Sequence, residues 1–136
     1  MEQPAMAGDR FAGTLIGALG IVVLEQAAER MTGRMPIDGR TIQPAGVAHG
    51  GALISLAETL ASIGTALSTD AATEICVGQE IGASLLRPAL SGTVVEGEAL
   101  LLHRGRTSAV WDVRIRTAEG KLAAVCRCTI AIRPMK

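Results

Sequence analysis

The clearest pattern in the chain is a run of hydrophobic residues spaced three and four apart between residues 52 and 67. A repeat of about 3.6 residues is typical of an amphipathic helix. The run contains no proline, and the glycine pair Gly50-Gly51 comes directly before it. The sequence therefore predicts one long helix over residues 52–67. Its apolar face carries Leu53, Leu56, Leu60, Ile63 and Leu67.

The opposite face of this helix carries a single ionisable side chain, Glu58, beside Ser62 and Thr65. A helix on a protein surface usually has several charged residues on its outer side, so we expect this face to be covered as well. Burial of a lone carboxylate has a large desolvation cost, and such groups are concentrated at sites of chemistry. The alternative is an ordinary buried ion pair between Glu58 and an arginine such as Arg87 or Arg106.

Short runs of alternating or β-branched residues on both sides of the helix predict strands. Two runs precede the helix, at residues 21–24 and 30–37, and four follow it, at 75–86, 93–102, 108–117 and 121–132. Turn-forming residues separate the later runs, which favours an antiparallel meander over parallel strands joined by helices. One long central helix enclosed by five or six antiparallel strands is an α+β layout, that of the hotdog fold.

Length and composition limit the classes of function. The chain has 136 residues, the size of one domain, and we expect a single domain over residues 1–136 in which residues 1–10 are loosely ordered. Its 13 basic residues balance 13 acidic ones, and aromatic side chains that could stack on nucleic-acid bases are almost absent. Hydrophobic residues make up 49% of the chain, which predicts surface buried between subunits. We therefore expect a homo-oligomer without a nucleic-acid partner.

The longest apolar run, Leu15–Leu24, is about half the length of a membrane span and follows no basic segment. We therefore expect neither a membrane anchor nor a signal peptide, and a cytoplasmic location. The cysteines Cys76, Cys126 and Cys128 do not have the spacing of a zinc site. They are expected to be reduced packing residues, and no metal site is predicted.

A second pattern lies before and inside the predicted helix. The segment 35–51 ends in His49-Gly50-Gly51 and is followed by Leu56-Ala57-Glu58. This combination resembles the hotdog acyl-CoA thioesterases, in particular the branch of the Arthrobacter-type 4-hydroxybenzoyl-CoA and 1,4-dihydroxy-2-naphthoyl-CoA thioesterases, together with phenylacetate-pathway thioesterases. The resemblance spans nearly all of residues 14–136, because further motifs occur in matching order: Leu86-Arg87-Pro88, His103-x-Gly105, Trp111-Asp112-Val113, Gly120-Lys121-Leu122 and Ile130–Pro134.

The resemblance implies a role for each residue of the active site. Glu58 would be the catalytic carboxylate, acting as nucleophile on the thioester carbonyl or as general base for water. Gln43 and His49 would lie beside the thioester oxygen and orient it. Gly51 would polarise that oxygen through its backbone N–H, and Ser62, one helical turn after Glu58, would position water.

General physical reasons agree with these roles. Gly50 and Gly51 lack a Cβ, so an acyl group can approach the backbone closely. N–H groups in the first turn of a helix favour developing negative charge. Glu58 and Ser62 are four residues apart and therefore lie on the same face of a helix. A carboxylate positioned as a general base typically contributes about 10²–10⁴ in rate.

Three of these residues also have simpler interpretations. Gln43 lies in a loop before Pro44, where its side chain could only satisfy backbone groups. His49 could cap the helix without taking part in chemistry. Ser62 could donate its hydroxyl back to the carbonyl of Glu58.

For coenzyme A, the resemblance implies a phosphate site at the subunit surface. The matching positions are Arg87, Gly105, Arg106, Thr107, Arg133 and Lys136. Arginine and lysine suit phosphate groups, but each could equally be a solvated surface charge. The acyl pocket would be lined by Leu53, Ile54, Leu85 and the segment near Leu15, which leaves open whether the acyl group is aromatic or a fatty chain.

The resemblance thus implies hydrolysis of an aryl- or acyl-CoA thioester, a small-molecule substrate, by a homotetramer built from two dimers. Glu58 of one subunit would face Gln43 and His49 of another, and no cofactor is implied beyond the CoA of the substrate. Two alternatives from other classes are a hydratase or dehydratase acting on acyl thioesters and a non-catalytic acyl-CoA-binding module. Thiol release from a panel of CoA esters separates them, because only hydrolysis frees the thiol.

Overall fold

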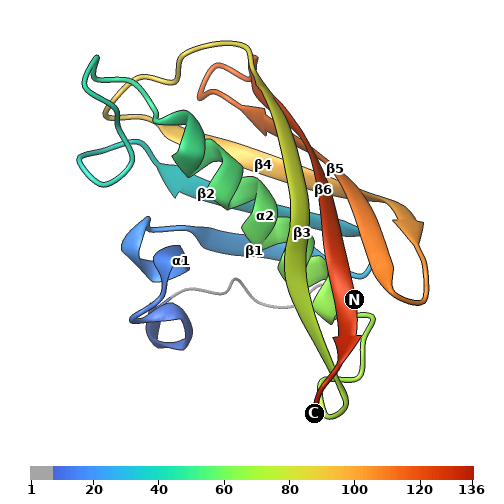
Figure 1. The fold of residues 1–136 in the computed structure, drawn as a ribbon. Helices are drawn as coiled ribbons and strands as arrows, with labels where there is room; N and C mark the ends of the chain where they lie inside the picture. The colour runs from blue at the N-terminus through green and yellow to red at the C-terminus, as the bar shows by residue number, and fades with distance from the viewer. Residues whose placement is uncertain (1–7) are drawn as a thin grey trace.

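The computed structural model describes residues 8–136, which form an antiparallel sheet wrapped around one long helix (Figure 1). The predicted loose segment at residues 1–10 lies outside the described residues, except that 8–10 begin a short 3₁₀ helix. The α+β arrangement is the one that the sequence predicts. In chain order the elements are η1 (Gly8–Phe11), α1 (Leu15–Ala18), β1 (Val22–Ala27), β2 (Arg30–Pro36), α2 (Gly50–Ala66), β3 (Glu74–Leu85), β4 (Val94–Arg104), β5 (Ser108–Arg116) and β6 (Leu122–Pro134).

The central helix α2 begins and ends at local signals. Its N-cap residue, His49, accepts a hydrogen bond from the backbone N–H of Gly51 at 2.8 Å. At the other end, the N–H of Ser68 donates to the carbonyl of Thr65 at 3.0 Å, which closes the last turn. The helix therefore starts two residues earlier than predicted, because the glycine pair lies inside its first turn. It ends one residue earlier than predicted.

The strand order corrects one prediction. Within residues 8–136 the six strands lie in the order β1-β2-β4-β5-β6-β3, so the predicted meander is confirmed for β4, β5 and β6. It is wrong for β3, which pairs with β6 instead of β4. The physical reason is that the segment joining β3 to β4 is not a hairpin: it lies against the loop before α2, where the N–H of Ala48 donates to the carbonyl of Ala89 at 2.8 Å and Val47 bridges Leu90.

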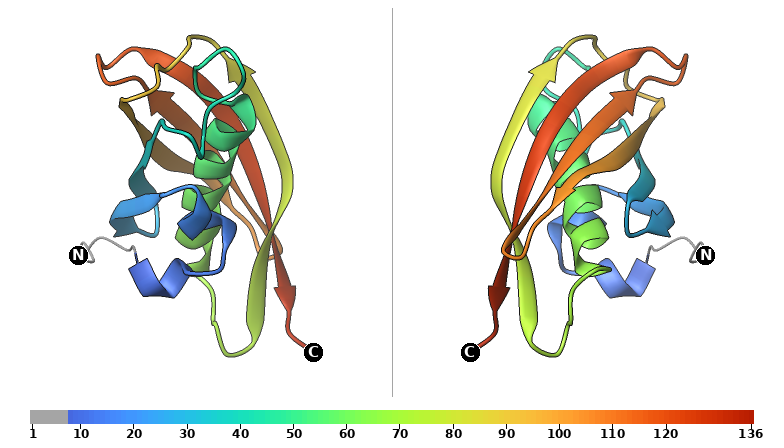
Figure 2. Two further views of the ribbon diagram at one scale, coloured as in Figure 1. Left: turned by 90° about the vertical axis from the view of Figure 1, so that its left-hand side faces the viewer. Right: turned by 90° about the vertical axis from the view of Figure 1, so that its right-hand side faces the viewer.

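The helix α2 crosses the concave face of the curved sheet (Figure 2). Gly33 of β2 and Gly97 of β4 pair directly, and the side chain of Leu60 lies on both. A Cβ at Gly33 would be 2.8 Å from one Leu60 methyl, and a Cβ at Gly97 would be 3.0 Å from the other. On the helix itself, a Cβ at Gly64 would be 2.6 Å from the ring of Trp111. Glycines on both layers therefore let the helix approach the sheet closely.

The N-terminal segment packs beside α2. Gly13, with a φ of +77°, separates η1 from α1, and the Thr14 side chain caps α1 by accepting a hydrogen bond from the N–H of Gly17. The N-terminal segment therefore forms two short helical turns separated by a glycine. Among residues 8–136, no helix is long and apolar enough to cross a membrane.

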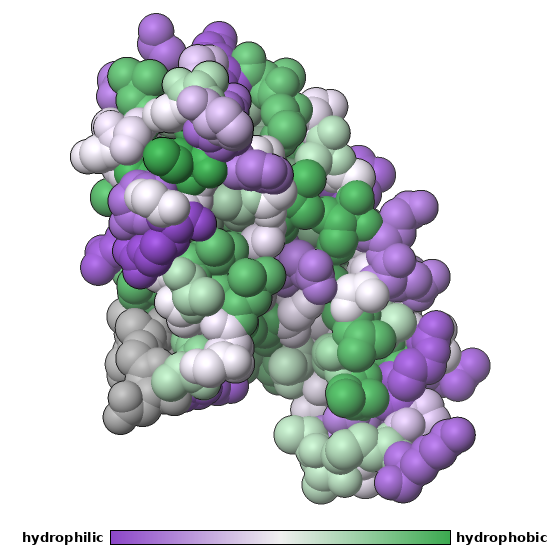
Figure 3. Space-filling model, turned by 60° about the vertical axis from the view of Figure 1, so that its left-hand side comes forward, coloured by the Kyte–Doolittle hydropathy of each residue, from purple (hydrophilic) through white to green (hydrophobic). Residues whose placement is uncertain are grey.

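The strand β3 forms one edge of the sheet and is largely exposed. Its apolar side chains Ile75, Val77 and Leu85 are 48%, 47% and 54% exposed. Figure 3 views the face that carries α1, α2 and β3, and hydrophobic surface is spread over it. A long exposed edge strand is a ready template for pairing with another chain.

Candidate active site

A stripe of small and polar residues runs along the side of α2 that faces away from the core. Gly51, Ser55, Glu58 and Ser62 follow one another at spacings of four, three and four, and therefore lie on one face of the helix. A pocket of about 250 Å³ opens beside this stripe. It is lined by Leu15, Ile16, Ile21, Ser55, Glu58, Thr59, Ser62 and Ile63. The candidate carboxylate thus faces a pocket with aliphatic walls.

Glu58 is half-buried and has no cation beside it in the described part of the chain. Arg87, one of the two arginines considered as its partner, instead donates to the carbonyl of Leu122 at 3.0 Å. The carboxylate lies between α2 and the inner face of β3, against Gly78: a Cβ there would be 2.5 Å from Oε2 of Glu58. The arrangement leaves a carboxylate available to a bound molecule.

Ser62 also lacks the bond that would make its role purely structural. Across residues 8–136, its hydroxyl makes no hydrogen bond to the carbonyl of Glu58. Other hydroxyls of the same helix do donate back by four residues: Ser55 to Gly51 and Thr59 to Ser55, at 2.8 and 2.7 Å. The Ser62 hydroxyl can therefore bind water or substrate in the pocket it shares with Glu58.

Gln43 begins a tight turn in the loop before α2. Its N–H donates to the carbonyl of Val47 at 2.9 Å, and its carbonyl accepts from Gly46, which has a φ of +83°. The side-chain oxygen accepts the N–H of Ala45 at 2.5 Å. Half of the Gln43 amide therefore does bind a backbone group, as the simpler interpretation expects. The NH₂ group is then the half of the amide that remains to donate.

His49 combines a capping role with a free donor. Because its Nδ1 accepts the N–H of Gly51, a neutral ring carries its proton on Nε2. The N–H of Gly51, which the sequence predicts as a donor to substrate, is therefore already engaged, and the His49 ring offers a side-chain N–H at the start of α2. The ring itself is exposed.

A single chain does not bring all of these residues into one pocket. Gln43 shares a pocket of about 300 Å³ with Gly50, Leu53, Leu85 and Arg87. His49 and Gly51 line another of about 240 Å³, which shares Leu15 and Ser55 with the Glu58 pocket. His49 therefore neighbours Glu58 along the helix, whereas Gln43 lies at a different side of α2. Of the expected acyl-pocket residues, Leu15 lies with Glu58, and Leu53 and Leu85 lie with Gln43.

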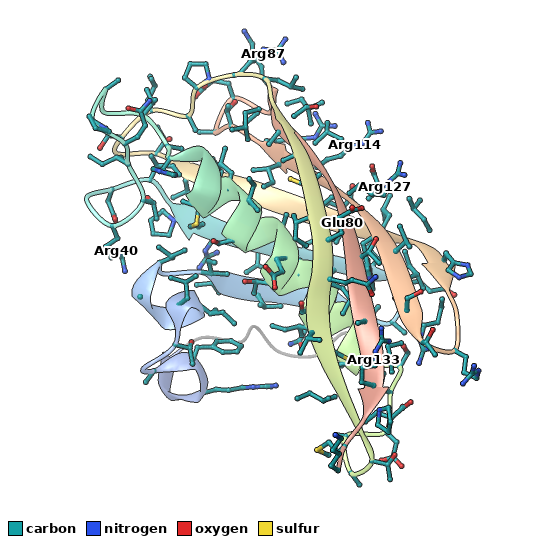
Figure 4. The ribbon with its side chains drawn as sticks, in the orientation of Figure 1. Arg40, Glu80, Arg87, Arg114, Arg127 and Arg133 are labelled. Carbon is teal, nitrogen blue, oxygen red and sulfur yellow. The ribbon has the colours of Figure 1, made fainter. Side chains whose placement is uncertain are left out.

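The expected phosphate-binding residues fall into two groups at opposite ends of the β3–β6 pair (Figure 4). Arg87 follows β3 and lies with Gln43. Arg133, on β6, donates to the carbonyl of Thr107 at 2.8 Å, so the turn with Gly105, Arg106 and Thr107 lies beside it. Lys136 is exposed at the end of the described chain. A single copy therefore offers two separate basic regions.

Charged and ionisable groups near the site were only partly foreseen from the sequence. Arg40 lines the His49 pocket and donates to Asp38 at 2.8 Å, which lowers the pKa of that carboxyl to about 2. Burial raises the pKa of the Cys126 thiol to about 11 and that of Cys128 to about 12. Both are unsuited to act as nucleophiles, because the thiolate is the reactive form. No group of three metal-binding side chains is placed together within residues 8–136.

Three residues near the site have no role in the sequence prediction: Ser55, Arg40 and Gly78. Ser55 lies one turn before Glu58 and could have been found from helical spacing. Gly78 is one of two glycines in a predicted strand, with Gly82, and a glycine there is a signal for close approach of another group, although the sequence does not say which glycine is approached or by which group. The Asp38-Gly39-Arg40 turn gave no sign that Arg40 reaches the helix start.

Comparison with known proteins supports the fold and identifies the family. Residues 45–124, more than half of the chain, match the family model described as the thioesterase superfamily. The proofreading thioesterase EntH of Klebsiella pneumoniae is 39% identical over 119 residues, 88% of this chain and 85% of EntH. The crystal structure of a mutant of thioesterase PA1618 from Pseudomonas aeruginosa is similar with a TM-score of 0.86 and 39% identity, covering 90% of this chain and 88% of that one. Thioesterase HI1161 of Haemophilus influenzae gives a TM-score of 0.83 at 36% identity, over 90% and 85% of the two chains.

Proposed function

Because the chain belongs to the thioesterase superfamily and has its hotdog fold, we propose that it hydrolyses an aryl- or acyl-CoA thioester with Glu58 as the reacting carboxylate. The observation that carries this proposal is the unpaired carboxylate of Glu58 beside a pocket of about 250 Å³. Glu58 either attacks the thioester carbonyl or removes a proton from the water that does so. A more specific assignment to the 4-hydroxybenzoyl-CoA or dihydroxynaphthoyl-CoA branch stays a prediction, as does a cytoplasmic location.

The size and lining of the Glu58 pocket favour a compact acyl group. An engineered apolar cavity of about 150 Å³ binds benzene, so a pocket of about 250 Å³ has room for one substituted aromatic ring or a short aliphatic chain. Leu15, Ile16 and Ile63 supply apolar contacts, and the hydroxyls of Ser55 and Ser62 can bind a polar substituent or water. An aromatic acyl-CoA is therefore the first substrate class to test.

The donors for the thioester oxygen follow from the loop before α2. His49 Nε2–H and the Gln43 NH₂ group are free side-chain donors there, because the other polar atom of each is engaged. In this proposal the Gly51 N–H fixes the His49 tautomer, and it polarises the oxygen directly only when the ring moves away. Gly50 has no Cβ, and a methyl group of Leu85 packs against its backbone in this structure.

We propose further that the active site is completed by a second copy of the chain, within a homotetramer formed from two dimers. Gln43 lies apart from Glu58 in a single copy, and β3 offers a long exposed edge at which two copies can pair. Gly78, next to Glu58, lies near the middle of that edge, so a partner pairing there would lie close to the carboxylate. One basic region contains Arg87, and the other contains Arg106 and Arg133. The two regions could then come from different subunits and hold the CoA phosphates.

The function is tested by thiol release from a panel of benzoyl-, hydroxybenzoyl-, phenylacetyl-, enoyl- and fatty acyl-CoA esters. We expect hydrolysis of at least one aromatic ester, and a decrease of about 10²–10⁴ in turnover for Glu58→Ala, the usual contribution of a positioned acid or base. Glu80→Ala is the matched control, because Glu80 is exposed on β3 (Figure 4). Tight binding without thiol release, or near-parental turnover by Glu58→Ala, would contradict the proposal.

The oligomeric state has its own test. Light scattering after size exclusion should give the mass of four chains. A charged substitution on the exposed edge, Val77→Asp, should shift that mass toward smaller species, because like charges would meet where copies pair. A monomer with full activity would exclude a shared active site.

A further inference from the structure

The carboxylate of Glu58 rests on a residue that has no side chain. Gly78 lies on the inner face of β3, opposite Ile130 of β6. A Cβ built on Gly78 would be 2.5 Å from Oε2 and 2.9 Å from Cδ of Glu58. Contacts of this length do not occur between a Cβ and another heavy atom, so any side chain at position 78 would displace the carboxylate or the strand.

The backbone of β3 changes its course at the same point. The pairing of β3 with β6 shifts between Gly78 and Glu80, so Gln79 is the extra residue of a β-bulge. Before the bulge Cys76 and Gly78 face the helix, and after it Ile81 does, whereas Glu80 pairs with the outward-facing Thr129. Without the extra residue, the alternation of a strand would place Glu80 on the inner face. The bulge therefore keeps a second carboxylate away from Glu58.

From these two observations we propose that Gly78 is a positioning residue for the reaction. It acts through Glu58. Because position 78 has no side chain, the Glu58 carboxylate can lie against the backbone of β3, and the bulge beside it turns the Glu80 carboxylate away from the same face. Bulges are over-represented beside active sites, where they re-aim a side chain. The inference rests on the proposed function, because it assigns Gly78 a role only if Glu58 reacts with substrate.

A purely structural role for Gly78 predicts a different outcome from a positioning role. Its φ is not in the left-handed region, and the residue is exposed, so alanine can adopt the same backbone. Glycine in a strand interior is generally less favourable than alanine. Gly78→Ala should therefore leave the fold intact, so that unfolding would not explain a loss of activity.

The experiment compares Gly78→Ala with Gly82→Ala. Gly82 lies on the same strand, is exposed, and has no heavy atom within 4 Å of its would-be Cβ. We expect Gly78→Ala to lower kcat by about 100-fold, the usual effect of a misplacement of about 1 Å, with KM changed by less than about threefold and an unchanged urea midpoint. Gly82→Ala should match the parent in all three. Equal kcat values for the two variants would overturn the proposal.

A rescue experiment separates displacement of Glu58 from other effects. Glu58→Asp shortens the side chain by one methylene and withdraws the carboxylate from Gly78. Adding Gly78→Ala to Glu58→Asp should then cost less than about threefold, against about 100-fold in the parent, because residues in contact are not additive. The same loss in both backgrounds would contradict the positioning role. If Glu58→Ala keeps parental turnover, the proposed function itself fails, whereas an inactive Glu58→Ala with an active Gly78→Ala excludes only the role of Gly78.

Discussion

The two faces of α2 serve different purposes although they belong to one helix. The core face carries Leu56 and Leu60, which are fully buried, and contacts glycines of the sheet. The site face carries Ser55, Glu58 and Ser62, which are only half-buried and line a pocket. A surface helix would place several charged residues on such a face. The difference indicates that packing of the core face supplies stability, whereas the site face borders a pocket in which a substrate can bind.

The largest stability effect should come from the core face. Leu60→Ala removes the side chain that packs on Gly33 and Gly97, and a Leu→Ala change at a buried site costs about 2–5 kcal/mol. Urea unfolding should show this loss, while kcat per folded molecule stays close to that of the parent. Ser55→Ala, on the site face, should cost less than about 0.5 kcal/mol. Equal losses for the two variants would remove the distinction between the faces.

A second effect concerns the polar contact between α2 and the only tryptophan of the chain. The indole N–H of Trp111 donates to the Thr65 hydroxyl at 2.9 Å, in a fully buried position. Thr65→Val keeps the shape but leaves that N–H without an acceptor, which costs about 1–3 kcal/mol. Thr65→Ser keeps the hydroxyl and serves as the control. Tryptophan fluorescence during urea titration measures both, and a stable Thr65→Val variant would show that the hydrogen bond is unimportant.

A smaller effect separates the two roles of His49. His49→Ala removes the cap of α2 and should cost about 0.5–2 kcal/mol. Asparagine is also a good N-cap residue, so His49→Asn should keep the urea midpoint of the parent. If the ring donates to the thioester oxygen, His49→Asn still lowers kcat. Retention of full turnover by the stable asparagine variant would make His49 a cap only.

The last effect, which appears only at alkaline pH, is a dependence of stability on the ionisation of two buried thiols. Burial raises the pKa of Cys126 to about 11 and of Cys128 to about 12. The unfolded chain loses these thiol protons first, so the free energy of unfolding should decrease as the pH rises from about 9 toward 11. The double variant Cys126→Ala/Cys128→Ala should show a flatter decrease in urea midpoint over this range. Identical slopes for parent and variant would contradict the assigned cause.

The helix and its carboxylate could be predicted because their signals are local. The spacing of Leu53, Leu56 and Leu60 depends only on helical geometry, and a lone Glu58 on the other face is visible in the same pattern. The position of β3 could not be predicted. The Ser91-Gly92 turn looks like part of a hairpin, and only the distant contact of Val47 with Leu90 makes the segment a crossover.

The site residues divide in the same way, into those with a local sequence signal and those that depend on contacts between distant segments. Glu58 and Ser62 follow from one helical turn, and the start of α2 at His49 was close to the prediction. The engagement of His49 Nδ1 and of the Gln43 oxygen depends on side-chain rotamers that no spacing reveals. The contact between Gly78 and Glu58 joins residues from different elements. Gly78 by itself indicates that some group approaches the strand closely, but it does not identify that group as Glu58.

A shared active site makes one prediction that a site within a single chain cannot match. Glu58→Ala and Gln43→Ala should each be nearly inactive alone. When the two variants are co-expressed with different tags and hybrid dimers are isolated, one of the two sites combines the intact Glu58 with the intact Gln43, so thiol release should return to about half of the parental rate per dimer. Hybrids no more active than the separate variants would show that Glu58 and Gln43 of the same chain must work together, and would contradict the shared site.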